Sequence, residues 1–521
     1  MPLPRLTRRA VLARAGLAGA GLAGAATLLG ACGRGAADSA ASGDQPRRGG
    51  DLAVAFQTGG SQETLDPHAA SLFVDGARGK ALFDKLVDLA GDMTPVLRLA
   101  ETLEPDDEAR VWRATLREAT FHDGSPVTAD DVLYSFARIL EPDSGRRAAA
   151  QLAPLDLDAS RAVDARTVEL VLDRPVAEFA TALAAFGAWI VPAGSEDFTA
   201  PVGSGPFRFG SFTPGGSLVV ERFDDYWEGA PHLDTVEFVP VNEETARINA
   251  LVGGQVGYAH DLSVTSARTY ADESRVEILA APGSLMHAFA MKLDRPPFDD
   301  PHVRAAFRLL ADRTELVDTA LAGMGEVGND LFGKGLRFYA DHLPQRERDL
   351  DQARDLLDRA GADGLSVTLH TAEAGGGLVD AAALFAEQAA QAGVDVRVEV
   401  GDADTFWADS FADGAISSYR SGVMPIATHI GNRLLSDASQ NITRWQDEQF
   451  DDRYAEMQRT VDDDARGEML GEMQQQLHES CGLLVWGFAD WLVGTADGVH
   501  GVQGAPPNTL EWARFDRVWR D

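Results

Sequence analysis

The chain has 521 residues, a hydrophobic fraction of 45% and a formal net charge of −35. It is therefore long enough for several domains, and its apolar content is that of an ordinary globular protein. Residues 1–31 contain four arginines and no acidic residue, so their removal takes the charge from −35 to −39. Such an acidic surface repels polyanions, which argues against nucleic acid and anionic lipid as partners and favours a role in solubility.

The N-terminus resembles an export signal. Arg8 and Arg9 precede an Ala/Gly/Leu-rich run that ends in Leu29-Gly30-Ala31-Cys32. A twin arginine is an export address for folded cargo, and small residues before a cysteine mark a lipoprotein cleavage site. A transmembrane anchor is disfavoured because the run of about 17 residues between Arg14 and Cys32 is short for a span. We expect a signal peptide at 1–31, a lipid on Cys32, and a location on the outer face of the bacterial cytoplasmic membrane.

The following elements are predicted from capping residues and apolar periodicity. Residues 32–49 are polar and Gly-rich, which predicts a flexible tether. Strands are expected at 51–56, 110–116 and 167–172, and residues 201–227 are rich in strand and turn formers. Helices are expected at 129–136 after an N-cap at Thr128, at 301–310 after Asp300, and at 351–360. A strand at 365–370, a helix at 378–392 and a strand at 394–400 predict a βαβ unit, so the fold class is α/β.

Motifs of catalysis and metal binding are missing. The 11 histidines are scattered without a His-Glu-x-x-His pattern, and Gly203-Ser204-Gly205 has the wrong spacing for a nucleophile elbow. Cys481 lies in an apolar run, which predicts a buried, inert thiol. We therefore expect no catalytic residue, no metal and no cofactor. An acid pair of the glycosidase kind stays open, because the sequence singles none out.

Several stretches resemble one family. Residues Phe121–Phe136, which read FHDGSPVTADDVLYSF, are similar to the signature of the peptide- and nickel-type (family 5) solute-binding proteins of ABC importers. Five further matches follow the family's order along the chain: TLDPH at 64–68, GSGPF at 203–207, YW at 226–227 with PHLD at 231–234, PFDDPHVRAA at 297–306, and LSD at 435–437 with Asn441 and FD at 450–451. The resemblance covers about residues 50–521 and is specific to the family but almost silent about the substrate.

The resemblance implies a two-lobed periplasmic-binding-protein fold of type II, in its large three-domain variant. Lobe one is expected at 50–70, 196–278 and 482–521, an inserted domain at 71–195, and lobe two at 279–481, with hinge crossings near 278 and 482. It also implies a monomer that captures a small ligand or modified peptide between its lobes and delivers it to permease subunits. The alternatives are a ligand sensor of the same fold and an extracellular hydrolase.

The expected ligand site departs from the family. Many peptide binders of the family carry an aspartate in lobe two that pairs with the peptide's α-ammonium. The corresponding loop, residues 418–425, lies in a stretch without any acid between Asp413 and Asp437, and it carries Arg420. A peptide with a free amine is therefore disfavoured, although Arg420 could instead face solvent or pair with a nearby acid. The candidate ligand-binding residues are Ser71, Phe73, Trp407, Tyr419 and Arg420. Sugar, modified peptide, metal chelate and other metabolites remain open.

Overall fold

The computed structural model describes residues 45–521 except residues 70, 404 and 439. The described helices and strands lie in one compact unit, Pro46–Asp521. The predicted signal peptide, Cys32 and most of the predicted tether lie outside the described residues. Among the helices that the structure describes, none is both long enough and apolar enough to cross a membrane.

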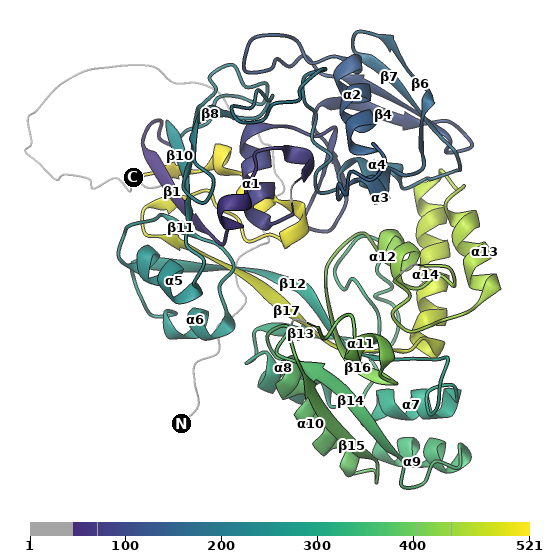
Figure 1. Cartoon of the computed structure of the whole chain (residues 1–521). Coiled ribbons are helices and arrows are strands. Elements are labelled where there is room, and N and C mark those ends of the chain that lie inside the picture. Colours follow the sequence, from purple (N-terminus) through teal and green to yellow (C-terminus); the bar gives the residue numbers. More distant parts are fainter. Residues whose placement is uncertain (1–44, 70, 404, 439) are drawn as a thin grey trace, which may run out of the picture. The chain divides into compact units, whose positions relative to one another are not determined.

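A mixed sheet of 11 strands runs through this unit (Figure 1). Its order is β15-β14-β16-β12-β17-β11-β1-β10-β9-β8, and β13 pairs with β17 beside this path. The strands are β1 (Asp51–Phe56), β8 (Phe207–Phe212), β9 (Leu218–Arg222), β10 (Thr235–Pro240), β11 (Tyr258–Ala259), β12 (Val276–Met291), β13 (Gly325–Val327), β14 (Ser366–Ala372), β15 (Asp395–Gly401), β16 (Ile416–Gly422) and β17 (Leu483–Ala496). The expected strand at 51–56 is confirmed as β1, and the strand-rich stretch 201–227 contains β8 and β9.

The two ends of this sheet belong to different apolar cores, which we call the first and second lobes. In the first lobe, β1 pairs in parallel with β10 and β11. Alternate β1 side chains, Leu52, Val54 and Phe56, join one core together with Phe238 and Trp512. Helices α1 (Phe73–Leu82), α5 (Glu244–Val252) and α6 (Val264–Thr269) accompany this end of the sheet.

The second lobe contains the predicted βαβ unit. β14 and β15 pair in parallel, and α10 (Leu378–Ala390) connects them, so the prediction is confirmed. Phe385 from α10 packs with Phe289 and Phe307, at ring-centroid separations of 4.8 and 6.1 Å. The expected helix after Asp300 is α7 (Pro301–Leu310), whose second amide donates to the Asp300 carboxylate, and the expected helix at 351–360 is α9 (Leu350–Arg359).

β12 and β17 join the lobes. They pair from Val276 with Ala496 to Ala290 with Leu483, and the register is irregular between Ala281 and Leu285. Ala281 and Trp491 pack in the first-lobe core, whereas Leu484 and Trp486 pack in the second-lobe core. The chain therefore passes between the two cores in the middle of both strands.

A separate sheet of four strands, in the order β4-β5-β7-β6, lies beside the first lobe (Figure 1). Its strands are β4 (Ala100–Pro105), β5 (Val111–Leu116), β6 (Leu155–Asp164) and β7 (Thr167–Leu172), and it is covered by α2 (Ala129–Ile139). Thr128 precedes α2, as predicted, and its amide donates to the Asp131 carboxylate over 2.7 Å. The strands expected at 110–116 and 167–172 are confirmed as β5 and β7.

The remaining described elements are short strands and helices around these sheets. They are β2 (Val87–Leu89), β3 (Pro95–Leu97), β18 (Val499–His500), β19 (Trp519–Arg520), α3 (Ala149–Leu152), α4 (Phe179–Leu183), α8 (Arg313–Ala320), α11 (Ser410–Asp413), α12 (Ile426–Arg433), α13 (Glu448–Met457) and α14 (Asp463–Ser480). Cys481 follows α14 and is buried as expected, and burial raises the pKa of its thiol.

The signature motif is a structural joint. The His122 amide donates to the Gly203 carbonyl over 2.8 Å, and the Gly203 amide donates to His122 Nδ1 over 3.2 Å. The other ring nitrogen lies 3.0 Å from the Gly205 carbonyl oxygen. Gly205 also donates to the Leu82 carbonyl at the end of α1. The motif therefore fastens the four-stranded region to the first lobe, which explains why it says nothing about a ligand.

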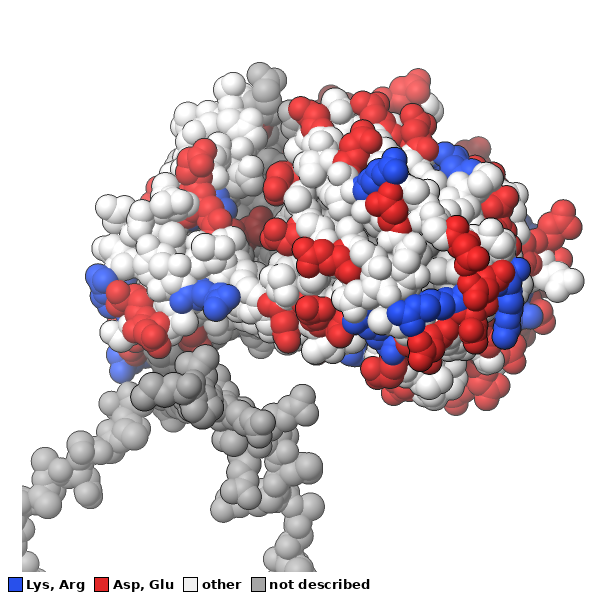
Figure 2. Space-filling view, turned by 90° about the horizontal axis from the view of Figure 1, so that it is seen from below, with Lys and Arg blue, Asp and Glu red and all other residues white. Residues whose placement is uncertain are grey.

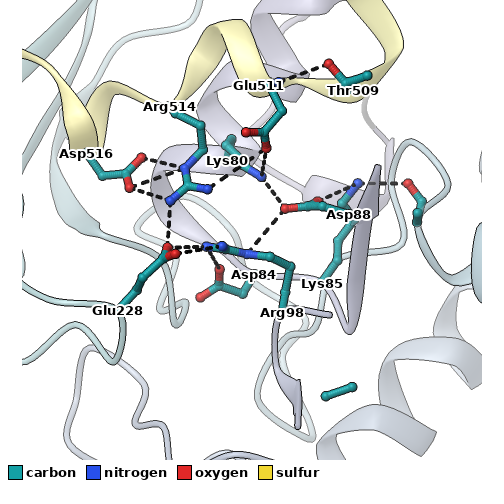
Figure 3. Close-up of polar contacts among 12 residues, drawn as sticks. Lys80, Asp84, Lys85, Asp88, Arg98, Glu228, Thr509, Glu511, Arg514 and Asp516 are labelled. Carbon is teal, nitrogen blue, oxygen red and sulfur yellow. Dashed lines mark hydrogen bonds and ion pairs between the residues drawn. The ribbon is translucent and has the colours of Figure 1, made fainter. Parts of the chain in front are cut away.

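A buried ionic network joins the end of α1 to the C-terminal segment (Figure 3). Asp88 accepts from Lys80, lies 3.1 Å from the Lys85 ammonium, and lies 3.4 Å from Arg98. Arg98 in turn pairs with Glu228 over 2.7 Å, and Glu228 pairs with Arg514 over 2.6 Å. Lys80, Lys85 and Asp88 are all at most 5% exposed. Because they have little contact with water, their charges are stabilised by their ionic partners rather than by hydration.

Candidate ligand-binding cleft

A cleft of about 1300 Å³ opens between the two lobes and is lined by residues of both. The first lobe contributes the start of α1, the segment after β11, and Trp491 of β17. The second lobe contributes the end of α8, the start of α10, β16, and the segments near Trp407 and Asn441. A cavity of this size, between two cores that share the long strands β12 and β17, has the form expected of a small-molecule site.

Four of the five candidate residues lie on the cleft. Phe73, Trp407, Tyr419 and Arg420 are among its lining residues. Ser71 does not line it. Ser71 is exposed, and its backbone amide donates to the Asp75 carboxylate over 3.0 Å. It therefore belongs to the cap of α1. The structure thus brings residues that are more than 300 positions apart in the sequence to one cavity, and it leaves Ser71 outside.

The first-lobe wall is aromatic. The Phe73 ring lies 5.3 Å from Trp491 and 5.7 Å from His260, both measured between centroids. Trp491 is 8% exposed, and its Nε1–H has no acceptor within the described part of the chain.

Arg247, also on this wall, is held by the backbone. Its guanidinium donates to the carbonyls of Val241, Asn242, His260 and Asp261 over 2.7–3.0 Å. These contacts fix the loop after β11, in which Asp261 has φ = 53°. Arg247 therefore shapes the wall, and its donors are already used.

Arg420 projects from β16 and pairs across the strands with His287 of β12. Among the residues described, Arg420 forms no hydrogen bond or ion pair, and its side chain is exposed to the cleft. Burial lowers the pKa of His287 to about 3, and the positive charge of Arg420 adds to this effect. Burial raises the pKa of Asp261, whereas the charges of Arg247 and Arg420 oppose that rise. Asp261 and Arg420 both line the cleft and do not form an ion pair within the described structure.

Three aromatic rings line the second-lobe wall. Phe411 lies 5.5 Å from both Trp407 and Tyr419, and Trp407 lies 6.3 Å from Tyr419 in an edge arrangement. Tyr419 is 3% exposed, whereas Trp407 is 39% exposed. Tyr419 is therefore a supporting ring, and Trp407 offers a free face to a ligand.

Lys292 lies directly after β12 and was not among the candidate residues. It is 1% exposed, its ammonium donates to the Ile442 carbonyl over 2.5 Å, and it lies 3.8 Å from the Phe411 ring centroid. Burial, together with the charges of the nearby Arg444 and Arg295, lowers the pKa of Lys292 to about 7. Lys292 is one of only four lysines in the sequence, a rarity that could have drawn attention to it.

The cleft has the opposite charge balance to the rest of the chain. Six basic residues line it, namely Arg147, Arg247, Lys292, Arg420, Arg433 and Arg444, against four acidic ones, Glu244, Asp261, Asp380 and Asp490. The whole chain carries a net charge of −35, and Figure 2 shows acidic side chains spread over one face of the molecule. A basic cavity within an acidic protein favours a ligand that carries negative charge.

The chain is similar to known solute-binding proteins. The family model described as bacterial extracellular solute-binding proteins, family 5 Middle, matches residues 94–439. Glutathione-binding protein GsiB of Salmonella typhimurium is 28% identical over 359 residues, which cover 67% of this chain and 70% of that protein.

Two solved structures extend the similarity to most of the chain. CtaP of Listeria monocytogenes, an ABC transporter substrate-binding protein, superposes with a TM-score of 0.80 at 21% identity over 91% of this chain and 100% of its own. AgaA of A. tumefaciens R10, solved with agropinic acid, has a TM-score of 0.71 at 25% identity over 91% and 99%. The expected two-lobed periplasmic-binding-protein fold of type II is thereby confirmed.

Proposed function

The chain belongs to the bacterial extracellular solute-binding proteins of family 5, which deliver ligands to ABC importers, and we propose that it is lipid-anchored and captures an anionic small ligand by lobe closure. The observation that carries the proposal is the cleft of about 1300 Å³, which is lined by both lobes and has an excess of basic residues. The proteins to which the chain is similar are solute-binding proteins rather than enzymes. We infer binding without covalent chemistry, because closure alone would capture and release the ligand.

The hinge is proposed to lie in the middle of β12 and β17. The register irregularity between Ala281 and Leu285 interrupts the pairing where the chain leaves the first-lobe core. The Gly283 amide there donates to the Asp490 carboxylate of β17 over 3.3 Å. Bending at this point would leave the cores around β1 and around α10 intact, whereas contacts of the four-stranded region with the second lobe, such as Glu178 with Arg466, would have to adjust.

Export and anchoring are proposed from the sequence. Arg8-Arg9 and Leu29-Gly30-Ala31-Cys32 support twin-arginine export followed by lipidation of Cys32. Replacing Cys32 with Ala should move the protein from the membrane to the soluble fraction. Unchanged attachment to the membrane would contradict the lipid anchor.

The ligand is proposed to be an acid rather than a peptide held through a free amine. The loop at 418–425 has no carboxylate to pair with an ammonium group, and Arg420 stands in the cleft without an ion pair in the described structure. AgaA, one of the similar proteins, was solved with agropinic acid, which supports an acidic ligand. Native mass spectrometry of the purified protein would detect a co-purified ligand, which should be acidic and should stay unchanged on prolonged incubation with the protein.

Arg420→Ala should weaken binding of that co-purified ligand by about 1.5–3 kcal/mol, the worth of a hydrogen bond to a charged group. Isothermal titration calorimetry would measure the difference after the ligand has been removed by partial unfolding and refolding. Equal affinity in the wild type and the variant would place Arg420 on the solvated surface and remove it from the site. Tight binding of unmodified di- to pentapeptides would separately contradict the proposed specificity.

A further inference from the structure

Three cations meet at the second-lobe end of the cleft. Lys292, Arg433 and Arg444 line it together with the Phe411 and Tyr419 rings, and we call this part the basic recess. Lys292 comes from the end of β12, Arg433 is the last residue of α12, and Arg444 lies in the loop between α12 and α13. Each of the three residues thus belongs to a different segment, and the fold rather than the local sequence brings these segments together.

Backbone hydrogen bonds hold these three elements together. The amides of Lys292 and Leu293 donate to the carbonyls of Ala415 and Thr443, each over 2.8 Å. The Ile442 amide donates to the Arg433 carbonyl over 3.2 Å. These bonds fix the backbone of the three segments from which the cations project.

Among the described residues, no carboxylate forms an ion pair with Lys292, Arg433 or Arg444. The Lys292 ammonium contacts the Ile442 carbonyl and the face of Phe411. Across the described residues, Arg433 and Arg444 make no ion pair and no side-chain hydrogen bond, and the Arg433 Nε–H is buried without an acceptor. The acid nearest to Lys292 in electrostatic effect, Asp294, is already paired with Arg295 over 2.7 Å.

An arrangement of this kind is costly for an isolated protein. Like charges repel, and a buried cation without a counter-charge loses its hydration without a compensating partner. The lowered pKa of Lys292, at about 7, reflects this cost, since burial and the charges of Arg444 and Arg295 all disfavour its protonated form. An anion placed among the three groups would remove the repulsion and accept several hydrogen bonds at once.

We propose that the basic recess is a subsite for an oxyanion of the transported ligand, a carboxylate or a phosphate, attached to a flat or apolar group that packs against the aromatic wall. The proposal rests on the proposed function, because it concerns the same cleft. Lys292 and Arg444 would donate to the oxyanion, and the positive charge of Arg433 would add to its attraction. Trp407, with its free face, would cover the flat group.

Four probes separate the parts of this proposal. Benzoate and phenyl phosphate carry an oxyanion on a ring, benzamide has the ring without the charge, and inorganic phosphate has the charge without the ring. Binding to the ligand-free wild type would be followed by Trp fluorescence and checked by calorimetry. We expect benzoate or phenyl phosphate to bind more tightly than benzamide and inorganic phosphate. The ratio of the dissociation constants of benzoate and phenyl phosphate identifies the preferred oxyanion.

The variants are Lys292→Met and Arg444→Gln, with Arg359→Gln as the control. Arg359 is exposed on α9 in the same lobe and does not line the cleft, so its replacement changes the net charge equally. Each recess variant should bind the preferred probe about 10- to 100-fold more weakly than the wild type, which is the range for losing a hydrogen bond to a charged group. The control should bind like the wild type.

Lys292→Met carries a second, independent readout. Because its folded pKa lies below the unfolded value of 10.5, charging Lys292 at neutral pH costs stability in the ligand-free protein. The variant should therefore melt at a higher temperature than the wild type without ligand, while it binds the probe more weakly. A variant that melts lower and binds the probe normally would show that Lys292 is a structural group.

The outcomes distinguish this proposal from the proposed function. If benzoate and phenyl phosphate bind no better than benzamide, or if Lys292→Met and Arg444→Gln bind them like the wild type, the oxyanion subsite is overturned. The proposed function would still stand in that case, provided that a co-purified ligand compacts the protein. The subsite is supported if the anionic probes bind the wild type and if both recess variants bind them more weakly.

Discussion

Asp88→Asn is expected to destabilise the fold by about 3–5 kcal/mol, the cost of breaking a buried ionic group by removing one partner. Lys80 and Lys85 are at most 5% exposed, and the variant removes the carboxylate charge that both of them share (Figure 3). Denaturant titration of the wild type and the variant would measure the change in free energy of unfolding. Asp107→Asn is the matched control, because Asp107 loses the same charge in an exposed turn between β4 and β5.

The same network predicts a dependence on pH. Burial alone would raise the pKa of Asp88, but Lys80, Lys85 and Arg98 outweigh it and hold that pKa well below the usual value of 3.8. Its contribution is therefore complete above pH 3.8 and is lost as the pH falls through the folded pKa. The wild type should lose more stability than Asp88→Asn in acid. Equal stability of the two proteins at pH 7 would contradict a role for the network.

Gly203→Ala is expected to cost about 3 kcal/mol, at the upper end of the range for overpacking. A β-carbon at position 203 would lie 1.9 Å from the Leu82 carbonyl oxygen and 2.8 Å from the Phe83 ring, so the backbone of the joint must move. The joint connects α1, the segment before β8 and His122 of the signature motif. Soluble yield and melting temperature would both fall.

Gly59→Ala provides the control for this steric argument. A β-carbon there would meet its nearest atoms at 3.5 and 3.6 Å, which is ordinary contact, and its φ of −84° suits any residue. We expect a change within about 0.5 kcal/mol. A Gly203→Ala protein as stable as Gly59→Ala would show that α1 and the segment before β8 can separate without cost.

Local patterns were sufficient for the parts of the fold that depend on short-range physics. The βαβ unit around α10 and the helix after Asp300 follow from apolar periodicity and capping, and both are present as expected. The hinge depends on long-range packing instead. The family resemblance implied a second crossing near 482, whereas the packing of Leu484 and Trp486 with the second lobe supports our proposal of a bend further along β17.

The site was predictable only where a resemblance supplied a loop. Phe73, Trp407, Tyr419 and Arg420 line the cleft, but Ser71, which was proposed from the same loop as Phe73, serves the cap of α1. Lys292, Arg433 and Arg444 come from three elements that meet only in the folded chain. No periodicity or spacing links them, because backbone hydrogen bonds such as that of Leu293 with Thr443 create their proximity.

Small-angle scattering of the purified protein with and without its co-purified ligand is the most direct test of capture between the lobes. The account predicts a smaller radius of gyration with ligand, a higher melting temperature because the ligand binds only the folded state, and a ligand that is acidic and recovered unchanged. An unaltered radius of gyration on saturation, or steady consumption of the ligand by sub-stoichiometric protein, would contradict it.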